Sequence, residues 1–137
     1  MNDCIFCKIV AGEIPSYKVF EDENTLAFLD IHPTSPGHTL VIPKSSQSTT
    51  IFDISSEDWS AMMATTHKLV PIIVQALSAD GVNLIMNNGE HAGQIIFHPH
   101  MHIIPRFKGD NLHTWPSGSY KEGEAEVILQ KVRAISN

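Results

Sequence analysis

The sequence is poor in cysteine and in basic residues. Among its 137 residues there are only two cysteines, Cys4 and Cys7, so no disulfide framework is expected to hold the fold together. The 9 Lys and Arg residues are outnumbered by 15 Asp and Glu residues, which gives a formal net charge of −6. Because nucleic acids are bound by basic surfaces, this balance predicts no nucleic-acid partner, although one pocket could still bind a small anion.

Long apolar stretches are lacking as well. No run approaches the roughly 18 residues of a membrane-spanning helix, so we expect no membrane partner. The opening segment MNDCIFCKIVAGEIP has Asp3 where a signal peptide would carry positive charge, and its apolar run is short. These features predict a cytoplasmic protein, and a reducing compartment favours free thiols or a metal over a bridge between Cys4 and Cys7.

The remaining composition is that of one folded domain. With 42% hydrophobic and 18% charged residues the chain can bury an ordinary core, and we assign residues 1–137 to a single domain. Helical periodicity and capping residues predict a long helix that begins after Ser55, with shorter helices over 3–12 and 122–135. Apolar patterns and turn residues predict strands over 17–21, 25–29, 38–44, 82–88 and 95–105. Strands grouped around one long helix favour an α+β fold with a mostly antiparallel sheet.

Histidine is concentrated in the segment FHPHMHIIPR, where His98, His100 and His102 stand at every second position. In a strand these three side chains share one face. The alternate residues are expected to pack on the core: Phe97, Pro99, Met101 and Ile103. Imidazole binds zinc and copper, but alternate strand residues lie about 7 Å apart, whereas tetrahedral zinc needs ligands at about 2 Å. A row of imidazoles better suits phosphate chemistry, as a nucleophile, a proton donor and an anion contact.

A glycine-bearing stretch, NNGEHAGQ, directly precedes the histidine strand. Gly89 and Gly93 allow the backbone to approach a ligand closely, and successive N–H groups there could bind an anion. An ordinary hairpin turn explains the two glycines equally well.

Taken together, these motifs resemble the histidine triad (HIT) family of nucleotidyl hydrolases and transferases. HPHMHII matches the family pattern of three histidines alternating with hydrophobic residues, with Pro99 as a weak hydrophobic position. CIFCKIVAGEIP, LAFLDIHPTSPGHTLVIPK and NNGEHAGQ occur in the family's order and spacing. The resemblance implies a HIT-like fold: a five-stranded, mostly antiparallel sheet with one long helix and shorter terminal helices, from a chain that forms a homodimer.

The resemblance also implies roles for individual residues. His100 would attack an α-phosphorus and form a nucleotidyl-imidazole intermediate, and His102 would contact the phosphate and help the leaving group depart. His98 would orient the cluster, and His38 in GHTLVIP would complete it. The residues implied to bind a purine nucleotide are Phe28, Asp30, Ile31, Asn87, Gly93, Gln94 and Ile95. Asp30 has an alternative role as a turn residue before IHPTSPG.

Three departures limit this transfer of roles. Many bacterial members bind a structural zinc through two cysteines, the first triad histidine and a histidine that corresponds to Ser46 here. Cys4, Cys7 and His98 remain as ligands, and because three ligands make a weaker structural site, we expect neither a bound metal nor a cofactor. Ile95 replaces a small hydroxyl residue found near the phosphate in several members. Trp115 could reach toward a partner subunit's site, or it could simply pack.

The leading hypothesis is a hydrolase of the phosphoramidase-like branch. It would cleave the α-phosphate linkage of purine nucleoside 5′-monophosphate derivatives such as AMP phosphoramidates. A dinucleoside polyphosphate hydrolase with the same nucleophile is one alternative, and a non-catalytic nucleotide- or metal-binding module is another.

Overall fold

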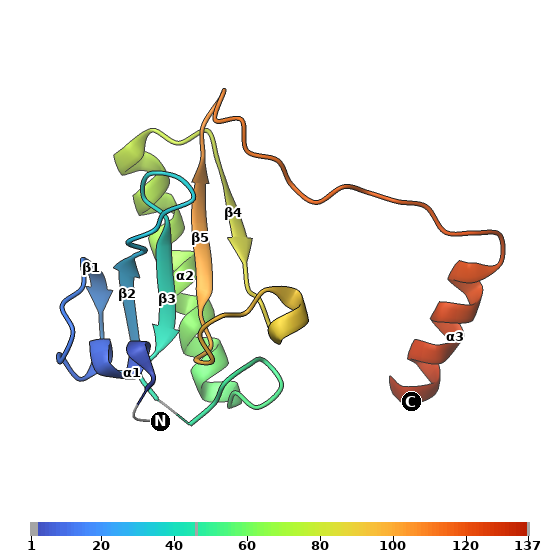
Figure 1. Cartoon of the computed structure of the whole chain (residues 1–137), viewed down its shortest axis with the longest axis horizontal. Coiled ribbons are helices and arrows are strands. Elements are labelled where there is room, and N and C mark those ends of the chain that lie inside the picture. The colour runs from blue at the N-terminus through green and yellow to red at the C-terminus, as the bar shows by residue number, and fades with distance from the viewer. Residues whose placement is uncertain (1–2, 46, 137) are drawn as a thin grey trace.

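The computed structural model describes residues 3–45 and 47–136, and Figure 1 shows one sheet with helices on both faces. The five strands run in the order β1-β2-β3-β5-β4, and every neighbouring pair is antiparallel. Their bounds are β1 Lys18–Glu21, β2 Thr25–Leu29, β3 Thr39–Pro43, β4 Gly81–Ile85 and β5 Met101–Arg106. This arrangement confirms the α+β fold with an antiparallel sheet.

The long helix α2 (Ser56–Leu77) covers one face of the sheet. Its N-cap is Ser55 as expected, because the Ser55 side chain accepts a hydrogen bond from the backbone N–H of Asp58 at 3.1 Å. The helix continues through Pro71 without interruption. Between α2 and the sheet lies the larger apolar core: Ala27, Val41, Met62, Leu69, Ile73, Met101 and Ile103.

The short helix α1 (Ile5–Val10) covers part of the opposite face. Phe6 is buried there with Leu26, Phe28, Leu40 and Ile42 in a second apolar cluster. His102 lies directly opposite Leu40 of β3, so its side chain shares this face of the sheet. The histidine face is therefore the α1 face, and α2 closes the other.

Strand β5 is shorter than the strand expected over 95–105. It begins at Met101, so only His102 of the triad lies within the ladder, and His98 and His100 precede it. Pro99 has no backbone N–H to donate, which explains why pairing does not extend back through it. The expectation that Phe97 packs on the core is wrong, since Phe97 is 49% exposed, whereas Pro99 is buried.

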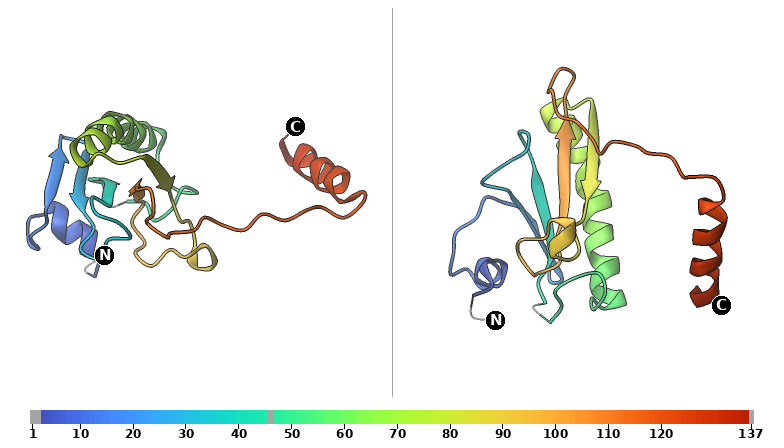
Figure 2. Two further views of the ribbon diagram at one scale, coloured as in Figure 1. Left: turned by 90° about the horizontal axis from the view of Figure 1, so that it is seen from above. Right: turned by 45° about the vertical axis from the view of Figure 1, so that its right-hand side comes forward.

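The chain leaves β5 through a turn and then runs as an extended arm to helix α3 (Glu124–Ser136), which stands away from the sheet (Figures 1 and 2). The sequence predicted this helix over 122–135. Within the described residues, no helix combines the length and apolar character that crossing a membrane would require.

Candidate active site

His38 and His102 are joined by a hydrogen bond of 2.9 Å between Nε2 of His38 and Nδ1 of His102. Nδ1 of His38 also accepts a bond from the backbone N–H of Thr34 at 3.0 Å. An amide N–H can only donate, so Nδ1 of His38 carries no proton and its Nε2 must donate to His102. His102 is consequently protonated on Nε2.

The Nε2–H group of His102 is the last group in this series of hydrogen bonds, which runs from Thr34 through His38. Among the described residues, Nε2 of His102 is one of the buried side-chain polar atoms without a hydrogen-bond partner. A buried donor without a partner is costly in a folded protein, and such groups are often explained by a ligand. The N–H of Thr34 thus fixes the tautomer of His38, and His38 in turn fixes that of His102. As a result, the hydrogen-bond donor that His102 presents to the site is its Nε2–H.

His100 is held in the opposite tautomer. Its Nδ1 lies 2.7 Å from the carbonyl oxygen of His98, and because a carbonyl can only accept, Nδ1 carries the proton. Nε2 is therefore left with a free lone pair, which a nucleophilic imidazole requires. The rings of His100 and His102 are neighbours, with centroids 4.9 Å apart. The edge-on ring of Phe6, 5.1 Å from His100 between centroids, supports the other side.

The local electrostatics favour neutral imidazoles. Burial lowers the pKa values of His38, His98 and His100 below the ordinary value of 6.5. For His102, burial and repulsion from His100 and His38 lower the pKa to about 4. The carboxylate of Asp30, whose Oδ2 lies 3.7 Å from Nε2 of His38, opposes these shifts only in part. All four histidines are therefore neutral at pH 7.

Stability should fall as the pH is lowered from 7 to 4.5. Each of these histidines has a lower pKa when folded than when unfolded, so unfolding takes up protons below about pH 6.5 and acid favours the unfolded chain. The measurement is Tm against pH by circular dichroism. His102→Gln should flatten the profile, whereas His67→Gln, a change at an exposed histidine of α2, should leave it unchanged. A Tm that stays constant or rises toward pH 4.5 would contradict the assignment of neutral, buried imidazoles.

The loop before the histidines is braced by the side chain of Gln94. Gln94 is 4% exposed, donates to the carbonyls of Thr49 and Ile96, and accepts from the N–H of Gly89 at 2.8 Å. The backbone N–H groups of Gly93 and Gln94 donate to the carbonyls of Glu90 and Gly89, so both are already engaged in turns. Gly93 has a φ of 91°, which favours glycine.

The other residues expected to bind the nucleotide differ in how far they are exposed to solvent. Asp30 does form the turn that the alternative reading proposed, because its Oδ1 accepts from the N–H of His32 at 2.9 Å, and its second oxygen faces His38. Phe28 is 4% exposed within the α1 cluster, whereas Ile31 is 69% exposed. The side chain of Ile95 is 87% exposed.

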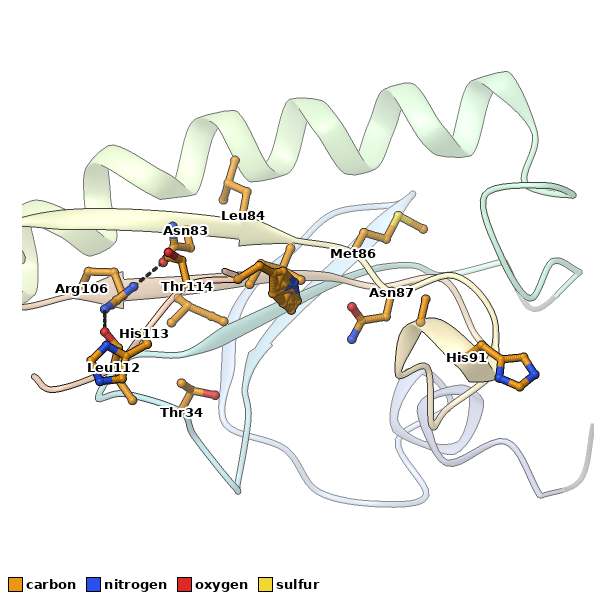
Figure 3. Close-up of a pocket in the computed structure, with 14 residues that line it drawn as sticks. Thr34, Asn83, Leu84, Met86, Asn87, His91, Arg106, Leu112, His113 and Thr114 are labelled. Atoms are coloured by element: carbon orange, nitrogen blue, oxygen red, sulfur yellow. Dashed lines mark hydrogen bonds between the residues drawn. The ribbon is translucent and has the colours of Figure 1, made fainter. Parts of the chain in front are cut away.

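A cavity of about 880 Å³ adjoins the histidine row along β4. Ile85 lies directly opposite His102 and, with Asn87, lines the cavity on this face. Figure 3 shows Asn87 and His91 at one end of the cavity and Arg106 and His113 at the other. Trp115 also lines this cavity, which belongs to the same chain, and its side chain is 67% exposed.

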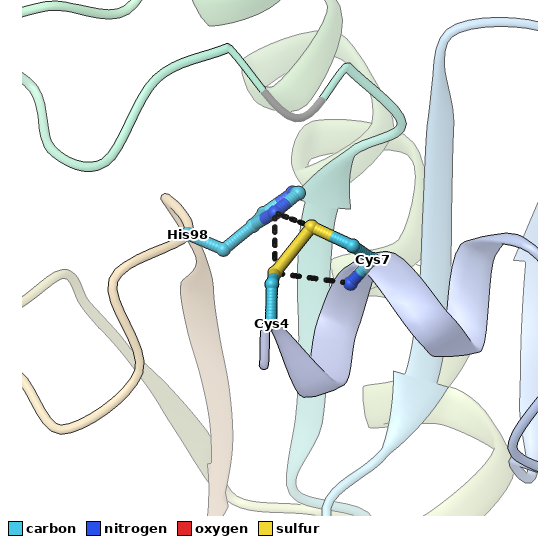
Figure 4. Close-up of side chains that lie close together, drawn as sticks. All are labelled: Cys4, Cys7 and His98. Atoms are coloured by element: carbon cyan, nitrogen blue, oxygen red, sulfur yellow. Dashed lines mark hydrogen bonds between the residues drawn. A yellow bond between two sulfur atoms is a disulfide. The ribbon is translucent and has the colours of Figure 1, made fainter. Parts of the chain in front are cut away.

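Two groups of side chains have the composition of a metal site. One consists of Asp30, His38 and His102, and the other of Cys4, Cys7 and His98. In the second group, Nδ1 of His98 lies 3.6 Å from each sulfur, and its Nε2 donates to the carbonyl of Pro43 (Figure 4). The structure joins Cys4 and Cys7 as a disulfide, which corrects the expectation of free thiols or a metal. Ser46, at the position of the expected fourth ligand, lies outside the described residues.

Sequence reasoning missed the groups that fix the tautomers and the positions of the histidine rings. Thr34 acts through its amide, Pro43 through its carbonyl, and Phe6 through ring packing from the first helix. No sequence pattern distinguishes such backbone contacts, since every residue offers a carbonyl and nearly every residue an amide. The fold and site together define a class of protein: a small α+β protein with clustered neutral histidines suited to group transfer at phosphorus.

Comparison with known proteins identifies the family. The HIT domain model matches residues 11–109. A crystal structure of SMU.412c from Streptococcus mutans UA159 is 40% identical, with a TM-score of 0.93 over 100% of this chain and 87% of that chain. Adenylylsulfatase HINT3 of Arabidopsis thaliana is 44% identical over 135 residues, which is 98% of this chain and 67% of that protein. Adenosine 5′-monophosphoramidase hnt1 of Schizosaccharomyces pombe is 44% identical over 103 residues, 75% and 74% of the two chains.

The chain belongs to the HIT family, in its nucleoside phosphoramidase-like branch, and is a hydrolase of that superfamily. The family match ends at residue 109, so the arm and α3 lie beyond it. The Streptococcus mutans structure, in contrast, matches the whole chain, including the arm.

Proposed function

We propose that this chain hydrolyses purine nucleoside 5′-monophosphate derivatives, AMP phosphoramidates among them, through a nucleotidyl intermediate on His100. The observation that carries the proposal is the pairing of tautomers. His100 is left with a free lone pair on Nε2, and the neighbouring His102 with an unpartnered Nε2–H. One nitrogen can attack phosphorus while the other donates a hydrogen bond beside it.

The reaction would proceed in two displacements. Nε2 of His100 attacks the α-phosphorus and the bond from phosphorus to the leaving nitrogen or oxygen breaks. The Nε2–H of His102 donates a hydrogen bond to the departing atom, and that atom takes its proton from solvent, because a neutral imidazole does not give up its N–H. Water then attacks the same phosphorus, loses a proton to solvent and releases the nucleotide from His100 as the bond between phosphorus and Nε2 of His100 breaks. The carbonyl of His98 stabilises the positive charge that His100 acquires in the intermediate, because it accepts the bond from Nδ1.

The proposed nucleotide contacts follow from the positions of the remaining side chains. Asn87 and the backbone of Ile95 would hold the phosphate, and Gly93 and Gln94 would set the shape of the loop that presents them. Asp30 would accept from the ribose hydroxyls, with Phe28 and Ile31 near the base. His98 would act as a positioning residue, since its carbonyl fixes the tautomer of His100.

The names of the two relatives support a substrate of this class, since one is an adenosine 5′-monophosphoramidase and the other an adenylylsulfatase. Both names describe an adenylyl group whose α-phosphate bears a small substituent. We further propose that the protein acts as a homodimer, as the family resemblance implied, and that it does so in the cytoplasm and without a resident metal or cofactor.

Initial rates on an adenosine 5′-phosphoramidate and on a dinucleoside tetraphosphate will separate this proposal from its alternatives. We expect kcat/KM to be at least about 100-fold higher for the phosphoramidate, because its leaving group is small and the Nε2–H of His102 can donate a hydrogen bond to it. A preference for the dinucleotide would favour a polyphosphate hydrolase instead. AMP binding without turnover of either compound would favour a non-catalytic binding module.

A further inference from the structure

The loop of residues 30–38, which joins β2 to β3, carries the amide on which two histidine tautomers depend. The N–H of Thr34 donates to Nδ1 of His38 at 3.0 Å, and Nε2 of His38 donates to Nδ1 of His102 at 2.9 Å. An amide makes such a bond only where the backbone holds it close to the acceptor and in line with it. The contacts that hold Thr34 in place therefore decide which nitrogen of His102 carries the proton.

The hydrogen-bonded ladder between β3 and β5 stops short of this loop. Its last pair is Thr39 with Ile103, and the same register continued would place Gly37 opposite Pro105. Gly37 instead turns the chain with a φ of 88°, and a Cβ at this position would lie 2.1 Å from Cδ1 of Leu77 in α2. Glycine is therefore needed both for the conformation and for the close approach. Beyond this point, a side chain takes over from the ladder in joining the loop to β5.

That side chain is Ser35. Its hydroxyl donates to the carbonyl of Pro105 in β5 at 2.6 Å, across 70 residues of sequence. The bond is shielded from water, because Ser35 is 5% exposed and Pro105 is fully buried. The backbone carbonyl of Ser35 also accepts from the N–H of His38 at 3.1 Å, which closes the turn around the Thr34 amide. Ser35 thus anchors the loop to the strand that carries His102.

We propose that Ser35 is a positioning residue for the proposed reaction. Its bond to β5 holds the Thr34 amide against His38 and thereby keeps the proton of His102 on Nε2. Ser35 has no direct part in the chemistry, because its hydroxyl is buried and engaged with Pro105. The effect on catalysis rests on the proposed function, whereas the tautomers are a property of the free protein.

Loss of the anchor has a defined chemical consequence. Without the amide of Thr34, nothing from the loop favours an unprotonated Nδ1 on His38, and its proton can reside on Nδ1 instead. Nε2 of His38 then becomes an acceptor, to which His102 donates from Nδ1. In this exchange each ring releases the proton of Nε2 to solvent and takes one from solvent on Nδ1, so neither charge changes. His102 then faces the site with a lone pair in place of its N–H.

The test is nitrogen NMR of the imidazole rings in isotope-labelled full chain without substrate, which distinguishes the two tautomers of each histidine. The wild-type protein should show the Nε2–H form at His38 and His102. Ser35→Ala should draw the two nitrogen resonances of each of these rings toward each other as the tautomers mix. Its kcat on an adenosine phosphoramidate should fall about 3- to 10-fold, the effect of one hydrogen bond, with KM changed less than about twofold.

A matched control removes a buried hydroxyl elsewhere. Thr66 is 2% exposed, and its hydroxyl donates to the carbonyl of Met62 within α2 at 2.8 Å. Thr66→Val removes the same kind of bond, yet should leave the imidazole resonances and kcat as in the wild type. Ser35→Cys keeps a side chain of similar shape with a weaker donor, so it should shift the resonances in the same direction even if Ser35→Ala does not fold.

Three results would overturn the inference: wild-type protein with the proton on Nδ1 of His102, Ser35 variants with wild-type imidazole resonances, or equal changes in Thr66→Val. Shifted resonances with an unchanged kcat would support the positioning by Ser35 and would count against the part of His102 in the proposed reaction. The NMR result and the kinetic result therefore separate a failure of this inference from a failure of the proposed function.

Discussion

His100→Ala is expected to lower kcat/KM for an adenosine phosphoramidate by about 10⁴-fold or more. The change removes an imidazole whose Nε2 lone pair is set free because its Nδ1–H donates to a backbone acceptor, the carbonyl of His98, at 2.7 Å. Loss of a covalent nucleophile typically costs this much or more, because no nearby group replaces it. The fold should survive, since the neighbouring ring of Phe6 also packs against Phe28 and His98.

The control for this prediction is an exposed histidine. His67→Ala on the outer side of α2 should retain wild-type kcat/KM. Binding of AMP to the His100→Ala protein, measured by calorimetry, should remain within about tenfold of wild type, because binding energy comes mainly from the phosphate and ribose contacts. Undiminished turnover in His100→Ala would rule out this residue as the nucleophile.

His102→Ala should lower kcat by about 10²–10³-fold, the usual effect of removing one oriented donor at a reacting phosphate or acyl group. The size of the loss should depend on the leaving group. A leaving group that is already acidic departs easily and needs little stabilisation by a hydrogen bond, so the kcat for such a substrate should fall much less than that for a phosphoramidate with a basic amine. Equal losses for both substrates would show that the Nε2–H of His102 does not assist the departure of the leaving group.

The hydrogen bond from His38 to His102 allows a second test of the role of His102. His38→Phe keeps a ring but cannot donate to Nδ1 of His102, so the tautomer of His102 is no longer fixed. The variant should show a reduced kcat with a largely unchanged KM, as expected when orientation rather than binding is lost. A loss confined to KM would instead indicate that His38 contributes to substrate binding alone.

Local sequence patterns were sufficient to predict those helices and strands whose formation is determined by their own residues. The strand expected over 25–29 is β2, and Ser55 caps α2 through its own hydroxyl and the amide of Asp58. They failed at residues 95–100, where alternation suggested a strand but Pro99 cannot donate to a ladder. Phe97 consequently turns outward, and the expected uniform row becomes two residues in a loop followed by one in a strand.

The chemistry of the site was only partly accessible from the sequence. Alternation indicated that the three histidines face one way, but the proton positions depend on the amide of Thr34 and the carbonyls of Pro43 and His98. These are backbone groups from three separate segments, and only the folded chain brings them together. The terminal helix was similarly predicted from the sequence, over 122–135, whereas its position away from the sheet is a property of the folded chain.

The most direct test of the catalytic proposal is to trap the intermediate. An adenosine phosphoramidate is mixed with the protein, the reaction is stopped in alkali because phosphoramidate bonds are acid-labile, and the peptides are examined by mass spectrometry. We predict an adenylyl adduct on the peptide containing His98, His100 and His102, with fragmentation that assigns it to His100. An adduct on another residue, or none during measurable turnover, would contradict nucleophilic catalysis by His100.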